Sequence, residues 1–347
     1  MLKELLKPFA AEQITDFWAK ELGLTWTWHK PIARIVKRQI EAKDTVSLWL
    51  KPNRRFLGFN AGQHINLTVQ VNGVYLTRSY SLSHAPQKNG LLRITIKQEA
   101  QGKVSQYLTQ QAQVGDTFEI SQAFGEFSLS AKKPNLLLAA GNGITPLMSL
   151  LHTATSQTTL LYWAKTRAEL SFVAELKQLK RANPLITVHY FLTQEKELLS
   201  HEHHGRISEE ILTKLVPDLE NYHVLACGNS GFVEQVKTLT SQAPSLQVEA
   251  FTPLIPQTTD STETVQVYLS KSQKTLSLPQ GQSLLNALEE QGVYPSSGCR
   301  MGICHSCSCK KQSGTTQDLQ NGEINQEPNS AVRLCVSRPQ SDLVLEI

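Results

Sequence analysis

The stretch "SSGCRMGICHSCSCKK", residues 296–311, holds four of the six cysteines of the chain: Cys299, Cys304, Cys307 and Cys309. Cys335 follows them, and Cys227 stands alone upstream. A disulfide framework would scatter its cysteines in pairs through a secreted chain. Clustered cysteines in a reducing compartment more often bind metal, so we expect a metal site near the C-terminus.

The spacing of four of these cysteines narrows the kind of metal site. Cys299, Cys304, Cys307 and Cys335 give C-x4-C-x2-C-x27-C. This matches the plant-type [2Fe–2S] spacing, in which one loop supplies three thiolates and a distant strand the fourth. A structural zinc site would normally show two close Cys-x2-Cys pairs, and the second pair is missing. Cys309 is interpreted as a buried strand cysteine, and the role of His305 stays open.

Composition limits the remaining possibilities. The chain has 347 residues, of which 40% are hydrophobic, enough for two or three domains with their own cores. A net charge of +4 without a basic run gives little support to a nucleic-acid partner. The N-terminus lacks a signal-peptide core, and the longest apolar stretch, 136–151, is too short to span a bilayer. We therefore expect a soluble, cytoplasmic protein without a transmembrane segment.

The first part of the chain divides into an extension and a β-rich domain. Residues 1–30 are rich in aromatic side chains, which indicates either a helix packed on the next domain or a contact with a membrane surface. In residues 31–131, alternating runs flank Asn72-Gly73, a strong hairpin signal. Many short strands with one helix at 104–111 predict a small antiparallel barrel.

The pattern changes after residue 131. From 132 to 255, short apolar runs alternate with helical segments, which predicts a parallel sheet covered by helices. Residues 256–264 are polar and are interpreted as a linker. The last domain, 265–347, begins with a hairpin and a helix that Ser283 is expected to cap and Gly292 to close.

A glycine loop follows the first parallel strand in "NLLLAAGNGITPLMSLL", residues 135–151. Gly141 and Gly143 would let a phosphate approach backbone amides, with Thr145 as N-cap and Pro146 in the first helical turn. A merely structural loop is an equally good interpretation of Gly-x-Gly alone. Its position at the carboxyl end of a parallel strand favours a ligand site.

A second loop, "VLACGNSGFVEQ" at 224–235, lies at another strand end. Cys227 can be a small buried hydrophobe, or a side chain that touches a bound ring beside the turn at Gly228. Together the two loops suggest a nicotinamide dinucleotide. Lys165 and Arg167 after the second strand favour a 2′-phosphate, hence NADPH over NADH. The alternative is an ordinary solvated basic helix start.

Hydride donors give two electrons together, whereas a [2Fe–2S] cluster takes one. A flavin must therefore stand between them. In "RSYSLS", residues 78–83, Arg78 can neutralise a phosphate, Tyr80 can lie along the ring or the ribityl chain, and Ser81 can hydrogen-bond a flavin nitrogen. Ser105 at a helix start suits a pyrophosphate. Taken alone, "RSYS" is only a polar strand end.

These motifs together carry a resemblance. Residues 31–253 resemble the ferredoxin–NADP reductase superfamily in three motifs, which occur in the expected order as Arg78/Tyr80/Ser81, Gly141/Gly143/Thr145/Pro146 and Cys227/Gly228/Phe232. Residues 265–347 resemble a plant-type ferredoxin. The resemblance implies FAD, an antiparallel β-barrel flavin domain, an α/β parallel-sheet nucleotide domain and an α+β β-grasp domain. Asn142 replaces a smaller residue, and Glu249 and Phe251 fall where the family often closes its flavin site.

The resemblance also implies an activity. Such a chain passes electrons from NADPH through FAD and the cluster to an external acceptor protein, with Ser81 and Cys227 nearest the hydride. The aromatic preface and "PNRRFLGFNAGQH", residues 52–64, look most like reductases of membrane-bound fatty-acid desaturases, which would place the chain at the inner membrane face. The alternative is the reductase component of a ring-hydroxylating oxygenase or other monooxygenase. A flavohaemoglobin-like or sensor module is a third class, disfavoured because no globin-like segment or DNA-binding helix pair is evident.

Overall fold

The computed structural model describes residues 25–28, 30–100, 102–251, 263–298, 300, 302 and 305–347. The chain forms two compact units, Met1–Phe251 and Thr252–Ile347. Most of the aromatic-rich extension at 1–30, with the helix expected there, and most of the predicted linker at 256–264 lie outside the described residues. In the part of the chain that is described, no helix is both long enough and apolar enough to cross a membrane.

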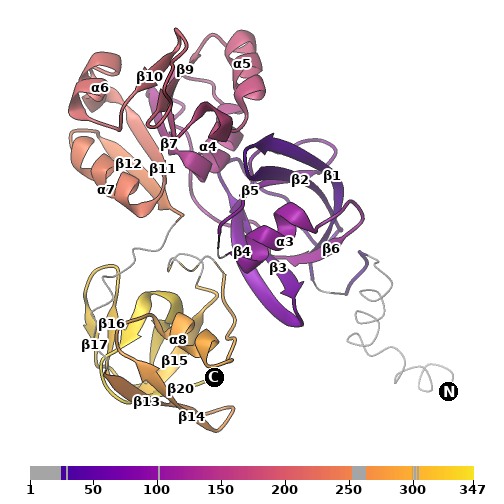
Figure 1. Cartoon of the computed structure of the whole chain (residues 1–347), viewed down its shortest axis with the longest axis vertical. Coiled ribbons are helices and arrows are strands. Elements are labelled where there is room, and N and C mark those ends of the chain that lie inside the picture. Colours follow the sequence, from indigo (N-terminus) through magenta and orange to yellow (C-terminus); the bar gives the residue numbers. More distant parts are fainter. Residues whose placement is uncertain are drawn as a thin grey trace, which may run out of the picture. The chain divides into compact units, whose positions relative to one another are not determined.

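The larger unit begins with an antiparallel sheet in the order β4-β3-β6-β1-β2-β5 (Figure 1). Its elements are β1 (Ile32–Ala42), β2 (Thr45–Pro52), β3 (His64–Val71), β4 (Val74–Ser81), β5 (Leu92–Lys97), α3 (Lys103–Gln110) and β6 (Thr117–Ile120). A bridge between Leu82 and Ile94 joins the end of β4 to β5, the opposite edge strand. The predicted barrel is confirmed.

The hairpin of β3 and β4 fixes the strand that carries the expected flavin residues. Asn72 and Gly73 have φ angles of 51° and 79°, the left-handed pair that a tight two-residue turn requires. Because this turn sets the register, Tyr80 lies opposite Ile65 and Ser81 opposite His64 at the far end of the hairpin.

A parallel sheet in the order β10-β9-β8-β7-β11-β12 completes the larger unit (Figure 1). Its strands are β7 (Asn135–Ala140), β8 (Thr158–Ala164), β9 (Ile186–Leu192), β10 (Glu202–His204), β11 (His223–Gly228) and β12 (Ser245–Ala250). Side chains of α4 (Ile144–Leu151) and α5 (Val173–Ala182) join one core cluster, and those of α6 (Glu209–Leu215) and α7 (Ser230–Leu239) join another. The predicted doubly covered sheet is confirmed, and β10 and β12 are additional edge strands.

The strand order of this sheet creates a crevice. From β7 the chain proceeds outward through β8, β9 and β10, then returns to β11 on the other side of β7. In open α/β sheets, ligands bind at the carboxyl ends of the strands where the order reverses. The reversal lies between β7 and β11, the two strands that precede the predicted glycine loops.

The smaller unit is a mixed sheet with one helix. Its main sheet has the order β14-β13-β20-β15-β18, and a small sheet the order β17-β16-β19. The elements are β13 (Thr264–Leu269), β14 (Lys274–Pro279), α8 (Leu284–Glu290), β15 (Ser308–Ser313), β16 (Thr316–Asp318), β17 (Ile324–Asn325), β18 (Ser330–Arg333), β19 (Ser337–Pro339) and β20 (Leu343–Leu345). The Ser283 side chain accepts a hydrogen bond from Asn286 N, and Gly292 has a φ of 75°, so both predicted helix ends are confirmed.

Candidate active site

The two predicted glycine loops meet at the crevice between β7 and β11. A Cβ atom on Gly143 would lie 1.9 Å from the carbonyl oxygen of Cys227, so only glycine permits this approach. A Cβ on Gly228 would lie 2.9 Å from that of Ala140. Gly141, by contrast, has a φ of 56° and open space where a side chain would be. The open side of the loop can therefore accept a phosphate against backbone.

The predicted N-cap at Thr145 is wrong. The 3-10 turn Gly141–Gly143 runs directly into α4, whose N-cap is Gly143. Thr145 therefore lies inside the first turn, and its hydroxyl donates to Asn142 O at 3.0 Å. Pro146 occupies the first turn as predicted.

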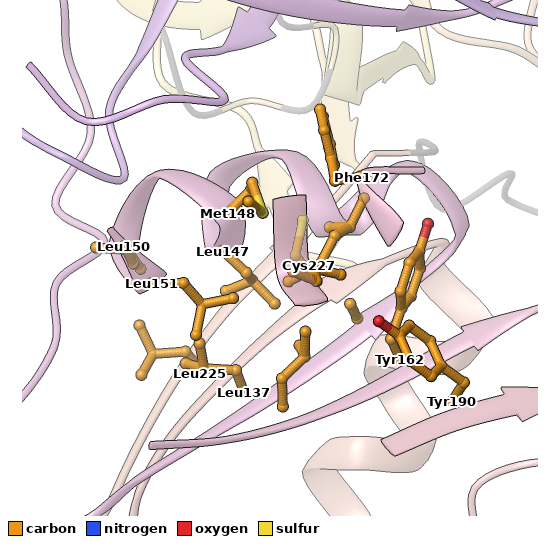
Figure 2. Close-up of a cluster of buried hydrophobic side chains, with 14 of the residues drawn as sticks. Leu137, Leu147, Met148, Leu150, Leu151, Tyr162, Phe172, Tyr190, Leu225 and Cys227 are labelled. Carbon is orange, nitrogen blue, oxygen red and sulfur yellow. The ribbon is translucent and has the colours of Figure 1, made fainter. Parts of the chain in front are cut away.

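Cys227 lies near the end of β11 and is fully buried. Figure 2 shows it in the apolar cluster that includes Leu147, Met148 and Phe172. Burial, together with the nearby carboxylate of Glu249, raises the pKa of the thiol well above its usual range, so the thiol is neutral. Cys227 can act through packing and position, and its contact with a bound ring stays a prediction.

A buried carboxyl group connects Cys227 to the barrel. Glu249 on β12 pairs with Cys227 in the sheet, and burial raises the pKa of Glu249 to about 7. Its Oε1 lies 4.0 Å from Nδ1 of His64, which is the register partner of Ser81 on β3. The two residues predicted to lie nearest the hydride are thus connected through His64 and Glu249. Phe251, just after β12, lies next to the second glycine loop: its backbone N–H donates to Gly228 O at 2.8 Å.

The remaining flavin predictions fall on β4 and α3. Arg78 and Tyr80 share one face of β4, and burial raises the pKa of the Tyr80 hydroxyl, which stays protonated. The Ser105 hydroxyl donates to Gly102 O at 3.0 Å and accepts from Glu99 N at 3.1 Å. Its donor is therefore used within its own loop. The start of α3 has no side-chain cap, which leaves its backbone as the better anion partner.

The two predicted cations after β8 differ in environment. Lys165 is exposed. The Arg167 guanidinium donates to both carboxylate oxygens of Glu202, at 2.7 and 2.6 Å, and its backbone N–H to Glu195. The sequence could not reveal this pairing, because Glu202 lies on the edge strand β10. Arg167 is held as an ion pair rather than left for a phosphate.

Two buried polar atoms near the crevice have no hydrogen-bond partner among the described residues: Nε1 of Trp163 and Oδ1 of Asn142. Trp163 lies at the end of β8, stacked on Phe191 and adjacent to Phe232. Asn142 lies in the glycine loop, with its amide nitrogen 3.4 Å from Thr95 O on the barrel. Buried polar atoms are normally satisfied, so both fit a site that receives a polar ligand. Trp163 was missed because a strand tryptophan carries no distinguishing sequence signal.

Cys307 and Cys335 lie together in the smaller unit. The pairing of Ser308 with Arg333, which joins β15 to β18, brings the cysteines that flank these strands together. Their Sγ atoms are 3.2 Å apart, and both thiols are buried and unlinked. Thiolates on one tetrahedral metal lie about 3.7 Å apart for metal–sulfur bonds of about 2.3 Å, so the pair fits a shared iron with little movement. Cys299 and Cys304 lie outside the described residues.

The described backbone of the cysteine loop is curled. Arg300, Gly302 and His305 have φ angles of 59°, 73° and 54°. Left-handed residues are common where backbone N–H groups donate to an anionic or sulfur acceptor, so these three fit a loop that binds a cluster. Nε of Arg300 is a buried donor without a partner among the described residues. Cys309 lies half-buried in β15, where burial raises its pKa to about 12, as expected of a bystander.

Arg333 holds the same loop from the strand side. Its guanidinium donates to Gly302 O at 2.6 Å and to the Asp318 carboxylate at 2.9 Å. Arg300 forms an ion pair with Glu289 of α8. The cysteine loop is therefore attached both to the helix and to the sheet.

Three family models match the chain in succession. An oxidoreductase FAD-binding domain covers residues 33–129, an oxidoreductase NAD-binding domain residues 137–238, and a 2Fe-2S iron-sulfur cluster binding domain residues 267–340. These matches confirm FAD, NAD(P)H and a [2Fe–2S] cluster as cofactors.

Full-length relatives share this architecture. An NADPH oxidoreductase of Mycobacterium tuberculosis is 31% identical over 336 residues, which are 93% of this chain and 86% of that protein. The ferredoxin reductase component of a 3-ketosteroid-9-alpha-monooxygenase of the same species is 30% identical over 316 residues, 84% and 86% of the two chains.

Solved structures agree. Phthalate dioxygenase reductase aligns with a TM-score of 0.64 at 24% identity, over 91% of this chain and 97% of that one, and supports the fold. The FAD/NAD-binding domain of a nitric oxide dioxygenase from Vibrio cholerae aligns with a TM-score of 0.59 at 26% identity, over 65% of this chain and all of that one. The chain belongs to the ferredoxin reductase-type oxidoreductases, as an NAD(P)H-dependent enzyme with FAD-binding, NAD-binding and C-terminal [2Fe–2S] domains.

Proposed function

We propose that this reductase supplies electrons, one at a time, to a separate oxygen-activating protein, an oxygenase component. The observation that carries the proposal is the thiol pair of Cys307 and Cys335, in a compact unit of its own. A terminal one-electron centre suits a protein acceptor, because a small two-electron substrate could be reduced at the flavin itself. Two relatives support this proposal by their names: one is the reductase subunit of a glycine betaine monooxygenase, and the other is the ferredoxin reductase component of a 3-ketosteroid-9-alpha-monooxygenase.

The site residues then have distinct proposed roles. The glycine loop at Gly141 and Gly143 receives the nucleotide against backbone, with Thr145 and Pro146 shaping the helix start. Arg78 binds a flavin phosphate and Tyr80 packs along the flavin. Ser81 and Cys227 position the flavin and nicotinamide rings. Gly228 and Phe232 line the nicotinamide site next to Cys227. Together the cofactors accept a hydride and release single electrons, so these residues contribute mainly position.

We further propose that NADPH is preferred over NADH, by a modest factor. Lys165 is the exposed cation after β8, whereas Arg167 is neutralised by Glu202. Lys165→Ala should reduce the preference for NADPH about tenfold through the apparent Kd, since one charge-assisted contact contributes about 1.5 kcal/mol. Arg167→Ala should instead lower the melting temperature with little change in preference. If Lys165→Ala leaves the ratio of kcat/KM for NADPH to kcat/KM for NADH unchanged, Lys165 does not bind the 2′-phosphate.

The acceptor is tested by reconstitution. Oxygenase components and a membrane desaturase in vesicles would be supplied with the purified reductase and NADPH, and product formation compared with ferricyanide reduction. Efficient coupling to a soluble oxygenase component supports the proposal. Ferricyanide reduction without coupling to any oxygen-activating acceptor would reject it.

A membrane-bound desaturase remains a second candidate because of one surface feature. Trp26, Trp28 and Leu57 are 52%, 37% and 86% exposed, and Asn53 attaches the segment to its neighbouring loop through Thr25 O at 2.8 Å. Arg55 donates to Thr27 O, between the two tryptophans, at 3.4 Å, and exposed tryptophan near a cation suits a lipid interface. A Trp26→Ser/Trp28→Ser variant should then lose vesicle binding and desaturase coupling while keeping ferricyanide reduction. Unchanged coupling would exclude the peripheral membrane location.

The domain limits 31–131, 132–255 and 265–347, with 1–30 as an extension and 256–264 as a linker, are also proposed. Limited proteolysis should cut first within 256–264.

A further inference from the structure

A cluster of three potential metal ligands lies outside the cofactor sites, where the barrel meets the nucleotide domain. His84 follows β4, His152 is the C-cap of α4, and Glu175 is in the first turn of α5. One ligand atom from each lies within 4.8 Å of the others. The two imidazole rings stack with centroids 4.1 Å apart, and Nε2 of His152 is 2.6 Å from Oε1 of Glu175.

His84 and Glu175 are both in the protonation state that a metal ligand needs. The Nε2 lone pair of His84 accepts from the side-chain amide of Gln87 at 3.0 Å, and a metal ion on Nε2 would displace that amide. Nδ1 of His84 is 2.9 Å from Ala85 O, a contact that requires the proton on Nδ1. Metal-binding histidines commonly use their second nitrogen in this way. Burial lowers the pKa of His84 and favours the neutral ring. Burial opposes ionisation of Glu175, but hydrogen bonds from His152 and Arg93 outweigh it and lower its pKa to about 2.

Arg93 supports the carboxylate from the opposite side. Its guanidinium donates to Oε2 of Glu175 at 2.6 Å, and it is buried between the rings of Trp49 and Phe172. A second nitrogen of the guanidinium donates at 3.2 Å to Oε1, the oxygen that also contacts His152, so a metal ion on Oε1 would share that oxygen with Arg93. Carboxylates that bind metals are usually hydrogen-bonded in turn, and Arg93 orients Glu175 in this way. The arrangement differs from a simple ion pair, which does not need the second histidine.

We propose that His84, His152 and Glu175 bind one divalent transition-metal ion, of the class of Zn²⁺ or Cu²⁺, which joins the flavin barrel to the nucleotide domain. Two imidazoles and a carboxylate are a ligand set that such ions prefer. Tetrahedral ligands on bonds of about 2.0–2.1 Å lie about 3.3 Å apart, so side-chain movements of about 1 Å complete the site. The side chains of His152 and Glu175 are 17% and 24% exposed, which provides an entry path.

Binding has two physical consequences. The ion takes the place of the hydrogen bond between Nε2 of His152 and Oε1 of Glu175, so protons compete with the metal for these ligands and acid weakens binding. It also stabilises the native unit by RT ln(1 + [metal]/Kd), about 2.7 kcal/mol at a metal concentration 100 times the Kd.

The test uses the full chain loaded with oxidised FAD and the oxidised cluster, both silent in EPR. Zn²⁺ titration by calorimetry should give one tight site, which weakens as the pH is lowered. Cu²⁺ EPR should give hyperfine splitting from two nitrogens. His84→Gln should weaken binding at least about tenfold and remove one nitrogen, while keeping the Arg93–Glu175 ion pair. His84→Gln/His152→Gln should abolish the site.

The matched control is a second pair of neighbouring histidines among the described residues. Nδ1 of His189 on β9 and Nε2 of His203 on β10 are 3.4 Å apart, close enough to chelate the same probe ions. His189→Gln/His203→Gln should leave the tight site, its two-nitrogen signal and the thermal shift intact. If this control removes them, or if His84→Gln/His152→Gln keeps them with normal flavin and cluster content, the proposal is wrong.

Discussion

Cys227, Cys307 and Cys335 are all buried thiols, yet their surroundings favour different chemistry. Cys227 lies in an apolar cluster next to a carboxyl group, and both features keep its thiol protonated. The Sγ atoms of Cys307 and Cys335 are 3.2 Å apart, and the positively charged Arg333 binds the loop before Cys307 through Gly302 O. The comparison teaches that burial alone does not determine what a cysteine does. A second thiol and positive charge favour metal ligation, whereas apolar packing and negative charge favour a neutral contact surface.

The largest effect is expected when one thiol of the pair Cys307/Cys335 is removed, because this tests whether the pair binds the cluster. Cys335→Ser should abolish the cluster and all electron transfer to a protein acceptor, because only three of the four expected thiolates remain. FAD content and NADPH-dependent ferricyanide reduction should persist. Iron analysis and EPR measure the effect, and a full cluster signal in the variant would reject Cys335 as a ligand.

The next largest effect is expected where Cys227 meets the glycine loop. Gly143→Ala would place a Cβ atom 1.9 Å from Cys227 O, so the two loops must separate. Flavin reduction by NADPH in stopped flow should slow about 100-fold, since a displacement of about 1 Å can cost that much. Gly231→Ala is the matched control, because its nearest neighbour would be 3.5 Å away. Equal rates in both variants would contradict the role of the close approach.

Glu249 gives a pH-dependent effect. Its pKa rises from 4.5 to about 7 on folding, so the folded state binds more protons than the unfolded state between these values. Stability should therefore fall as pH rises from about 4.5 to 7, by about 3 kcal/mol in total, and stay low above pH 7. Glu249→Gln should lose this slope and be more stable than the wild type at pH 8. Urea unfolding at several pH values measures it, and parallel curves would show that Glu249 is not neutral in the folded state.

The smallest effect is expected at Cys309, the cysteine that we do not assign to the cluster. Cys309→Ser should keep the iron content, the EPR spectrum and the reduction potential of the cluster, because its thiol stays protonated in β15. Loss of the cluster would mean that Cys309 is a ligand and that the four-cysteine assignment needs revision.

Local signals in the sequence predicted much of the fold. Asn72-Gly73, Ser283 and Gly292 act on the backbone next to them. The apolar runs at β7, β8 and β11 reflect burial on both faces, and β9 is buried in its second half. The misses involve contacts between distant residues. Thr145 looked like a cap because the 3-10 turn before it depends on the approach of Gly143 to β11.

The site shows the same limit. The motif residues could be proposed from the sequence because their types and spacing are specific, and their contacts with the cofactors stay predictions. The pairing of Arg167 with Glu202 and the connection from His64 to Glu249 join segments far apart in the chain, and neither has a local pattern.

The central claim is that reducing equivalents from NADPH pass through the flavin to the thiol-bound cluster. Anaerobic stopped flow combined with rapid-freeze EPR on the fully loaded chain tests it most directly. We expect the flavin absorbance to bleach first and the signal of a reduced [2Fe–2S] cluster to follow within the turnover time, with no such signal in Cys335→Ser. A bleached flavin beside a cluster that stays oxidised through many turnovers of a protein acceptor would contradict the account.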